Sequence, residues 1–290
     1  MMDVDGLNPI DMIQFNILAP YTDLVHGIFT RRGGDSSPPF DSLNMGLSTG
    51  DEVSHVRQNR CRIARHLGFK RALYLHQVHG NDVLVVDRES QVSNLTSHGM
   101  TTQSVQEIPN PYSNCPDNSF QQNGSPSAPL TLPVADGVVT NVPGILLVIQ
   151  VADCQAVVLF DPVKRVVANL HSGWRGNVAN IIGRGVEVMV TQFGCDPGNI
   201  RAGIGPSLGP CCAEFIHYKS ELPQAFLKYR QGEHHFDFWA ISRDQLMAKG
   251  IQPDHIEVTD LCTQCHPNRF FSYRHEKSTG RFAVAAGLCL

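Results

Sequence analysis

A stretch near the middle of the chain predicts a β-hairpin, and it constrains the fold more than any other feature. Two runs rich in β-branched residues, 152–161 and 166–171, flank an Asp-Pro turn. With the turn centred on the proline and the residue after it, Cys154 lies directly opposite His171 on the same face of the sheet, with Cβ atoms about 5 Å apart. The chain therefore places an antiparallel pair at the centre of its fold.

The predicted pairing of Cys154 with His171 leaves three interpretations of the cysteine open. A thiolate and an imidazole bound to one tetrahedral zinc have donor atoms about 3.5 Å apart, which this pairing allows. The same two groups also suit a nucleophilic thiol and its base, or a buried structural thiol. A third metal ligand must come from elsewhere. His76 and His79 lie three residues apart before a predicted strand, so in an extended segment at most one of them serves a given site.

Composition restricts the class of protein. The chain has 290 residues, enough to bury a core without disulfides, and a formal net charge of -4 without any run of Lys and Arg. The first basic residue is Arg31, whereas a secretory signal begins with basic residues, and the apolar runs fall short of the roughly 20 residues of a membrane span. We expect a cytoplasmic protein that binds neither nucleic acid nor membranes, with no oligomeric state indicated.

Short strands and helices alternate without an evident linker, which predicts a single mixed α and β domain over residues 1–290. Apolar spacing predicts one helix over 51–67 and another over about 178–193 that stops at Gly194. Between residues 89 and 133 the chain is polar with little periodicity, which is typical of a mobile insertion.

Two arginines beside glycines are candidate anion-binding residues. Arg31 follows a short predicted strand in a glycine-rich turn, whose backbone N–H groups suit an anion; an ordinary solvated turn is the alternative. Arg175 lies four residues after His171, before the predicted helix at 178–193. Free N–H groups and the dipole at a helix start attract anions, so an anion beside the predicted metal ligands is expected.

The run Cys262-Thr-Gln-Cys-His266 matches the attachment pattern of a c-type haem. Covalent haem attachment normally requires an exported chain, which disfavours that interpretation. A second zinc site is also disfavoured, because no matching pair of ligands is evident nearby in the sequence. The role of Cys262 and Cys265 stays open.

Eight short motifs, in order along the chain, resemble the YfiH or DUF152 family, whose members are named laccase-like polyphenol oxidoreductases or purine nucleoside phosphorylases. The resemblance extends from about His26 to the C-terminus and is interrupted by the polar insertion. The motifs are Phe29-Thr-Arg-Arg-Gly-Gly34, Ser42-Leu-Asn-Met-Gly46, Gln77-Val-His-Gly80, Ala135-Asp-Gly137, Ala152-Asp-Cys154, His171-Ser-Gly-Trp-Arg-Gly176, Gly205-Pro-Ser207 and Phe270-Phe-Ser-Tyr-Arg274.

The resemblance implies a single-domain α/β/β/α sandwich and a metal, usually zinc, held by His79, Cys154 and His171. It also implies phosphorolysis of adenosine, inosine, guanosine and methylthioadenosine, and hydrolytic deamination of adenosine. In such a site zinc with an open coordination position would serve the deamination, while Arg31 and Arg175 would hold phosphate near the ribose.

Three other functions are compatible with these residues. One Cys and two His also bind copper, as in a copper-dependent, laccase-like oxidase of phenols, although a laccase needs several coppers and many more histidines. A metal-free Cys-His hydrolase is the second alternative. A non-enzymatic sensor of metal or nucleotide is the third.

Overall fold

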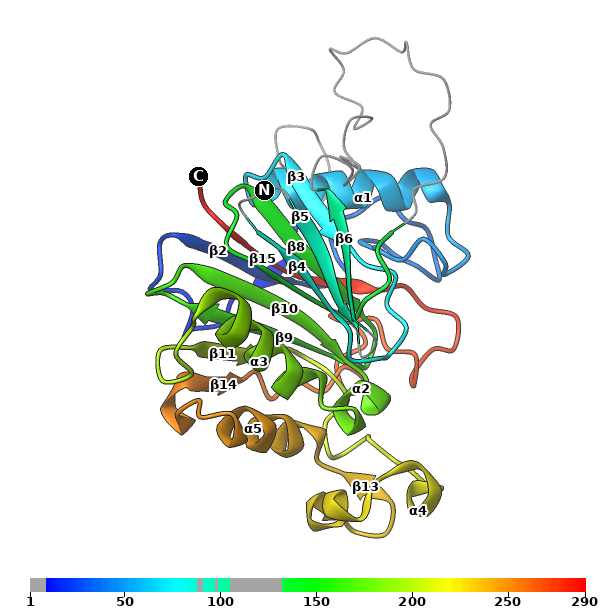
Figure 1. Ribbon diagram of the computed structural model, residues 1–290. Coiled ribbons are helices and arrows are strands. Elements are labelled where there is room, and N and C mark those ends of the chain that lie inside the picture. The colour runs from blue at the N-terminus through cyan, green and yellow to red at the C-terminus, as the bar shows by residue number, and fades with distance from the viewer. Residues whose placement is uncertain (1–8, 88–90, 97–98, 105–131) are drawn as a thin grey trace.

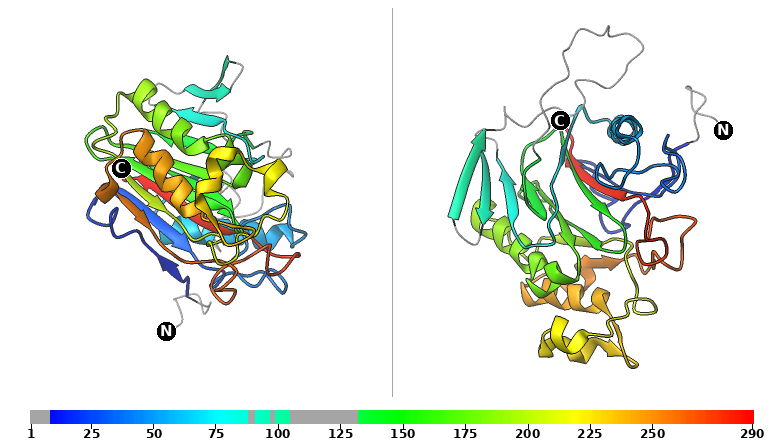
Figure 2. Two further views of the ribbon diagram at one scale, coloured as in Figure 1. Left: turned by 90° about the horizontal axis from the view of Figure 1, so that it is seen from below. Right: turned by 90° about the vertical axis from the view of Figure 1, so that its right-hand side faces the viewer.

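The computed structural model describes residues 9–87, 91–96, 99–104 and 132–290. Two β-sheets pack face to face, and helices cover both outer faces (Figure 1). Helix α1 lies on the opposite side of the sheets from α3 and α5 (Figure 2). The expected α/β/β/α sandwich is therefore confirmed. No described helix combines the length and the apolar character that a membrane crossing requires.

The smaller sheet has five strands, and its neighbours are antiparallel except for the parallel pair β3 and β8. In spatial order the strands are β1 (Met12–Ile13), β2 (Leu24–Phe29), β15 (Phe282–Leu288), β8 (Ile145–Val151) and β3 (Arg71–Tyr74). Helix α1 (Val53–His66) covers the outer face, where Ile63 and Ala64 pack against Phe29 and Tyr74. The helix predicted over 51–67 is confirmed, and Gly68 beyond it has a φ of 79°.

The larger sheet has eight strands and carries the predicted hairpin at its centre. In spatial order they are β14 (Ile256–Val258), β11 (Arg201–Ile204), β9 (Gln155–Asp161), β10 (Val166–Ser172), β7 (Gly137–Thr140), β4 (Val83–Val86), β5 (Gln91–Thr96) and β6 (Gly99–Ser104). The outer face packs against α3 (Ile181–Phe193) and α5 (Phe238–Ala248). Smaller elements are α2 (Trp174–Val178), α4 (Tyr218–Glu221), 3-10 turns at Gln224–Tyr229 and Pro253–His255, and a pair of short strands, β12 (Arg230–Gln231) and β13 (His235–Phe236).

Strand β9 explains why both faces of the central hairpin are buried. Every residue of β9 is buried, and its side chains alternate between the two cores. Val158 and Phe160 face the core between the sheets, whereas Val157 and Leu159 face α3. A strand with apolar residues on both sides is stable only where both faces are covered.

The register of the hairpin differs from the predicted one by two residues. His171 pairs with Ala156, so the direct pairing of His171 with Cys154 was wrong. The connection spans four residues, 162–165, rather than two. Asp161 stabilises this longer turn, because its Oδ1 accepts the N–H groups of the second and third turn residues at 2.9 and 3.0 Å. A shift of two residues preserves the face of the sheet on which each side chain lies.

The predicted helix at 178–193 begins later than expected and is preceded by a separate short helix. Asn180 has a left-handed φ of 56°, and its side-chain oxygen accepts the N–H of Gly183 at 3.0 Å. This cap separates α2 from α3. Arg175 therefore lies within the five-residue helix α2, not at the start of the long helix. Gly194 ends α3 with a φ of 64°, as predicted.

Two strands occur within the polar segment 89–133. β5 and β6 form an antiparallel pair, and β5 pairs with β4 at the edge of the larger sheet. The polar sequence gave no sign of them, because an exposed strand edge offers backbone partners whatever the side chains of the added strand. Apart from these strands and residues 132–133, the predicted insertion lies outside the described residues.

Candidate active site

Three side chains from distant segments meet at one end of the central strands. Cys154 directly precedes β9, His171 lies in β10, and His79 lies in the connection between β3 and β4. Their ligand atoms all lie within 4.8 Å of one another. The two imidazole rings are edge to face, with centroids 4.8 Å apart. One thiol and two imidazoles at this spacing suit zinc or copper, since both metals accept nitrogen and sulfur ligands.

Asp136 fixes the positions of both histidines. Its carboxylate is fully buried, and Oδ1 lies 2.7 Å from Nδ1 of His171. The same carboxylate accepts the N–H groups of Val78, His79 and Gly80 at 3.2, 2.8 and 2.7 Å. A carboxylate on the far nitrogen of a metal-binding histidine sets its ring orientation and leaves the other nitrogen for the metal. Asp136 therefore positions one histidine through its ring and the other through its backbone.

The segment that carries His79 is held in an unusual conformation. His79 has a left-handed φ of 63°, which residues with a side chain rarely adopt. Gln77 anchors the segment to β8, because its side chain donates to the carbonyl of Gln150 at 2.9 Å and accepts the N–H of Gln150 at 3.0 Å. Together with Asp136, these bonds keep the His79 ring over the site.

Gly173 leaves no room for a side chain beside the metal ligands. A Cβ at this position would lie 2.7 Å from Cδ2 of His79 and 3.1 Å from Sγ of Cys154. Its backbone, with φ at −72° and ψ at 174°, is one that any residue adopts. Glycine is therefore required at residue 173 for space rather than for conformation.

The three groups alter one another's protonation. Burial raises the pKa of the Cys154 thiol, but the charge of His171 and hydrogen bonds from both histidines lower it to about 6. Burial lowers the pKa of His171, but the charge of Cys154 and the hydrogen bond to Asp136 raise it to about 9. Burial also opposes the charge on Asp136, yet His171 and the backbone N–H groups hold its pKa below the usual value. The lowered pKa of Cys154 and the raised pKa of His171 favour a thiolate beside an imidazolium at neutral pH.

Metal affinity is expected to rise with pH as a result. A metal ligand must be a thiolate or a neutral imidazole, so between pH values of about 6 and about 9 metal binding displaces the proton of His171. The association constant should increase about tenfold per pH unit in this window, more steeply below it and little above it. Zinc competition with a chromophoric chelator at several pH values measures this dependence. A constant affinity from pH 6 to 9 would contradict the assigned protonation states.

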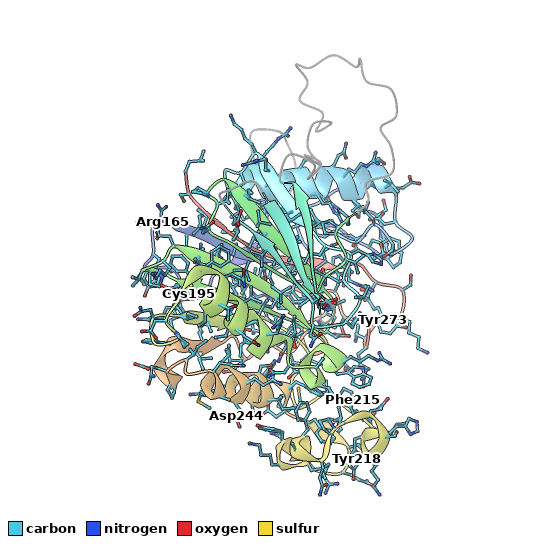
Figure 3. All side chains as sticks on the ribbon, viewed as in Figure 1. Arg165, Cys195, Phe215, Tyr218, Asp244 and Tyr273 are labelled. Carbon is cyan, nitrogen blue, oxygen red and sulfur yellow. The ribbon has the colours of Figure 1, made fainter. Side chains whose placement is uncertain are left out.

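The metal ligands open onto a cavity of about 940 Å³. Aromatic side chains form part of its wall, and the rings of Trp174 and Phe215 meet edge to face at 6.1 Å. Phe215 and Tyr273, both cavity residues, lie toward one end of the central strands, whereas Arg165 in the β9–β10 turn lies at the other end (Figure 3). Flat apolar rings beside charged groups suit a ligand with a planar heterocycle.

Two arginines of the cavity wall are suited to an anion. Arg281 donates to the carbonyl oxygens of Thr279 and Gly280 at 3.1 and 2.9 Å, so these partners leave its charge uncompensated. Burial lowers the pKa of Arg281, whereas the charge of Cys154, which lines the same cavity, raises it. Arg175 is exposed and lies over the ring of Trp174 at 4.3 Å.

Arg31 occupies a different environment from the one its motif suggests. It is not among the cavity-lining residues, and its guanidinium donates to the carbonyl oxygens of Asp41 and Pro267 at 2.8 and 2.9 Å. Carboxylate oxygens of Asp41 and Glu276 lie 3.4 and 3.7 Å from it. The structure thus joins His79, Cys154, His171 and Arg175 around one cavity but not Arg31, whose phosphate role stays a prediction from the sequence.

Sequence reasoning missed two residues of this site. Asp136 stands in the Ala-Asp-Gly motif, which enters the sequence analysis only through the family resemblance, although an acidic residue between apolar residues and a glycine was a usable signal for a buried anchor. Arg281 follows a glycine near the C-terminus in a run without any motif. No sequence signal indicated that this arginine would line the same cavity as Cys154.

Comparison with known proteins agrees with the fold and the motifs. Purine nucleoside phosphorylase YlmD from Geobacillus stearothermophilus is 31% identical over 280 residues, covering 92% of this chain and 91% of the relative. Purine nucleoside phosphorylase YfiH from Escherichia coli strain K12 is 32% identical over 265 residues, covering 88% and 89%. The crystal structure of YlmD from Geobacillus stearothermophilus superposes with a TM-score of 0.76 at 30% identity, covering 97% of this chain and all of that one.

A second solved structure, that of the hypothetical protein YfiH of Bacillus licheniformis, has a TM-score of 0.75 at 29% identity and covers 97% of this chain and 99% of that one. A family model described as multi-copper polyphenol oxidoreductase laccase matches residues 25–289. The chain belongs to this family, which is the YfiH or DUF152 family.

Proposed function

We propose that this protein is a zinc-dependent purine nucleoside phosphorylase that also deaminates adenosine. The observation that carries the proposal is the convergence of His79, Cys154 and His171 at a cavity whose wall also holds aromatic rings and Arg281. Relatives similar over about nine-tenths of their length bear the name purine nucleoside phosphorylase. The proposed substrates are adenosine, inosine, guanosine and methylthioadenosine.

Different residues of the chain would bind the phosphate and the purine during phosphorolysis. The two guanidinium groups of Arg281 and Arg175 would hold phosphate, because guanidinium binds its oxygens through paired hydrogen bonds. The rings of Trp174, Phe215 and Tyr273 would hold the purine and exclude water. Phosphate oxygen then bonds to C1′ of the sugar as the bond to the purine nitrogen breaks and that nitrogen takes up a proton, giving the sugar 1-phosphate and the free base.

His79, Cys154 and His171 would hold the metal, and Asp136 would keep the His171 ring and the His79 backbone in place around it. When bound, zinc with three protein ligands supplies a Lewis acid with one open position, which activates water and stabilises developing negative charge. The cavity is wide enough for a nucleoside and phosphate together, since ligand pockets of roughly 300–1,000 Å³ hold drug-sized molecules.

The decisive experiment incubates metal-stripped and zinc-restored protein with adenosine, with and without phosphate, and separates adenine, inosine and ribose 1-phosphate. The zinc-restored protein should form adenine and ribose 1-phosphate only with phosphate. It should form inosine in either condition, and with phosphate part of that inosine should be converted to hypoxanthine. Product formation by the metal-stripped protein at the full rate would show that the reactions do not require the metal. Absence of all products after zinc addition would show that the protein does not catalyse them.

Arg281→Gln is expected to weaken phosphate use selectively. A hydrogen bond to a charged group contributes about 1.5–3 kcal/mol, so the KM for phosphate should rise roughly 10- to 100-fold while deamination changes little. Steady-state phosphorolysis at several phosphate concentrations, beside deamination without phosphate, separates the two effects.

Two matched variants complete this experiment. Arg165→Gln removes an arginine at the opposite end of the strands and should change neither reaction. Arg31→Ala tests the prediction from the sequence. Loss of phosphate affinity in Arg31→Ala but not in Arg281→Gln would show that Arg31, and not Arg281, binds phosphate.

The description of the family model favours a second candidate, a copper-dependent oxidase of phenols. Within the described part of the chain, two groups of side chains are spaced to hold a metal, and one of them contains histidine. Laccase chemistry requires several coppers and more imidazole ligands than this site offers. Oxygen uptake with a phenol that depends on added copper and disappears in Cys154→Ala would establish the oxidase.

A further inference from the structure

Four cysteines form a cluster outside the candidate active site. Cys211, Cys212, Cys262 and Cys265 have sulfur atoms that all lie within 4.8 Å of one another. Sγ of Cys265 is 3.6 Å from that of Cys211 and 3.5 Å from that of Cys212. A disulfide has its sulfurs about 2.05 Å apart, whereas four thiolates on one tetrahedral zinc, with bonds of about 2.3 Å, lie about 3.8 Å apart. The observed spacing is that of thiols around a shared ion.

The fold brings the two cysteine pairs together from positions about fifty residues apart in the chain. Ser207 forms an isolated bridge with Cys262, in which the N–H of Ser207 donates to Leu261 at 3.2 Å and the N–H of Thr263 donates to Ser207 at 3.0 Å. A tight turn after Gly209 then directs Cys211 and Cys212 toward the second loop, since the N–H of Cys212 donates to the carbonyl of Gly209 at 2.9 Å. This cluster supplies the ligand pair that the Cys262-Thr-Gln-Cys265 run lacks in the sequence.

We propose that Cys211, Cys212, Cys262 and Cys265 bind a second zinc ion as a tetrathiolate. Four sulfur ligands in tetrahedral arrangement are typical of structural zinc, and they leave no open position for a substrate. The site is therefore structural and chemically separate from the site at His79, Cys154 and His171. It also accounts for the Cys-x-x-Cys-His run without a haem.

The location of the cluster indicates what the zinc stabilises. Asp153, the neighbour of Cys154, accepts the hydroxyl of Thr263 at 2.7 Å and the N–H of Leu208 at 2.9 Å. Both loops that carry the cysteines therefore contact the residue beside the catalytic metal site. Residues 213–217 on one loop and Tyr273 beyond the other line the cavity. A metal bound by both loops would fix this wall of the cavity without touching the substrate.

Metal content per chain tests the proposal independently of any activity. Protein purified with a thiol reductant should contain two zinc ions by elemental mass spectrometry. Cys265→Ser and Cys211→Ser should each contain one, Cys154→Ser should contain one, and the Cys154→Ser/Cys265→Ser double variant none. Cys289→Ser removes a thiol remote from both clusters and should retain two. Cys211 and Cys265 are exposed, so serine at either position creates no buried cavity.

Cobalt substitution identifies the ligands of each ion. Co²⁺ in the proposed site should give intense thiolate-to-metal charge transfer from four sulfurs, which Cys265→Ser weakens and Cys154→Ser leaves in place. In the wild-type protein zinc should also protect the four thiols from a thiol reagent, a measurement that does not depend on a folded variant. A wild-type chain with one ion that Cys154→Ser removes, a disulfide within the cluster in reduced protein, or iron in place of zinc would each overturn the proposal.

Discussion

Cys154→Ala protein is expected to form adenine and inosine from adenosine at least about 10³-fold more slowly than the wild type, a loss of about 4 kcal/mol of transition-state stabilisation. The reason is that Cys154 supplies the only sulfur ligand of the triad, and two histidines alone do not complete a three-ligand zinc site. Product formation with and without phosphate, together with zinc content, measures the effect. Both activities should fall together, and one zinc should be lost.

The same variant separates the proposed metal enzyme from a metal-free hydrolase with Cys154 as nucleophile. In a metal enzyme, chelator treatment of the wild type should reproduce the defect, and zinc should reverse it. In a Cys-His hydrolase, turnover would resist the chelator and a covalent adduct would accumulate on Cys154. Cys289→Ala serves as the control for general effects of losing a thiol.

Gly173→Ala is expected to reduce activity roughly 100-fold while leaving the fold intact. The added Cβ would meet His79 at 2.7 Å and Sγ of Cys154 at 3.1 Å, so two metal ligands must move. Displacements of about 1 Å in a site of this kind cost about 10²-fold. Because the backbone of Gly173 has an ordinary φ of −72°, the thermal unfolding midpoint should change little.

Gly198→Ala is the matched control for this variant. The nearest atom to its added Cβ is a carboxylate oxygen of Asp196 at 3.3 Å, remote from the metal ligands. Normal zinc content and normal turnover in Gly173→Ala would show that the ligands do not need the space this glycine leaves. An equal loss in both variants would point to a general effect of alanine.

The layers of the fold were predictable because they depend on patterns that repeat over many residues. The β-branched runs of β9 and β10 and the apolar spacing of α1 each span several residues, so a single misleading position does not change the prediction. The order of the four layers came from the family resemblance instead. Local periodicity does not say which sheet faces which helix.

The errors arose where one side chain decides the geometry. Asp161 caps a four-residue turn and shifts the hairpin register by two, and Asn180 interrupts the predicted helix with a left-handed φ. Both depend on the hydrogen bonds of one side chain, which compete with regular structure. The shared face of Cys154 and His171 survived because a two-residue shift keeps the alternation of side chains.

Convergence of distant segments was the least predictable part of the site. His79 was assigned as a ligand through the family resemblance, since its backbone conformation depends on Asp136, which is 57 residues further along the chain. The partners of Cys265, which are Cys211 and Cys212, are 54 and 53 residues away. No local pattern links such positions, and only the folded chain shows that they meet.

The buried carboxylate of Asp136 has a further consequence for how the protein acquires its ion. The bonds that hold the His171 ring and the His79 backbone are made by protein groups, so we expect the apoprotein to keep the geometry of the site. Loading and unloading then resemble ligand exchange in a rigid chelator, not the refolding of a zinc finger. Protein prepared from media rich in different transition metals should therefore contain different metals in the same fold. Dialysis against a buffer that contains a second metal should exchange the bound ion without unfolding the protein.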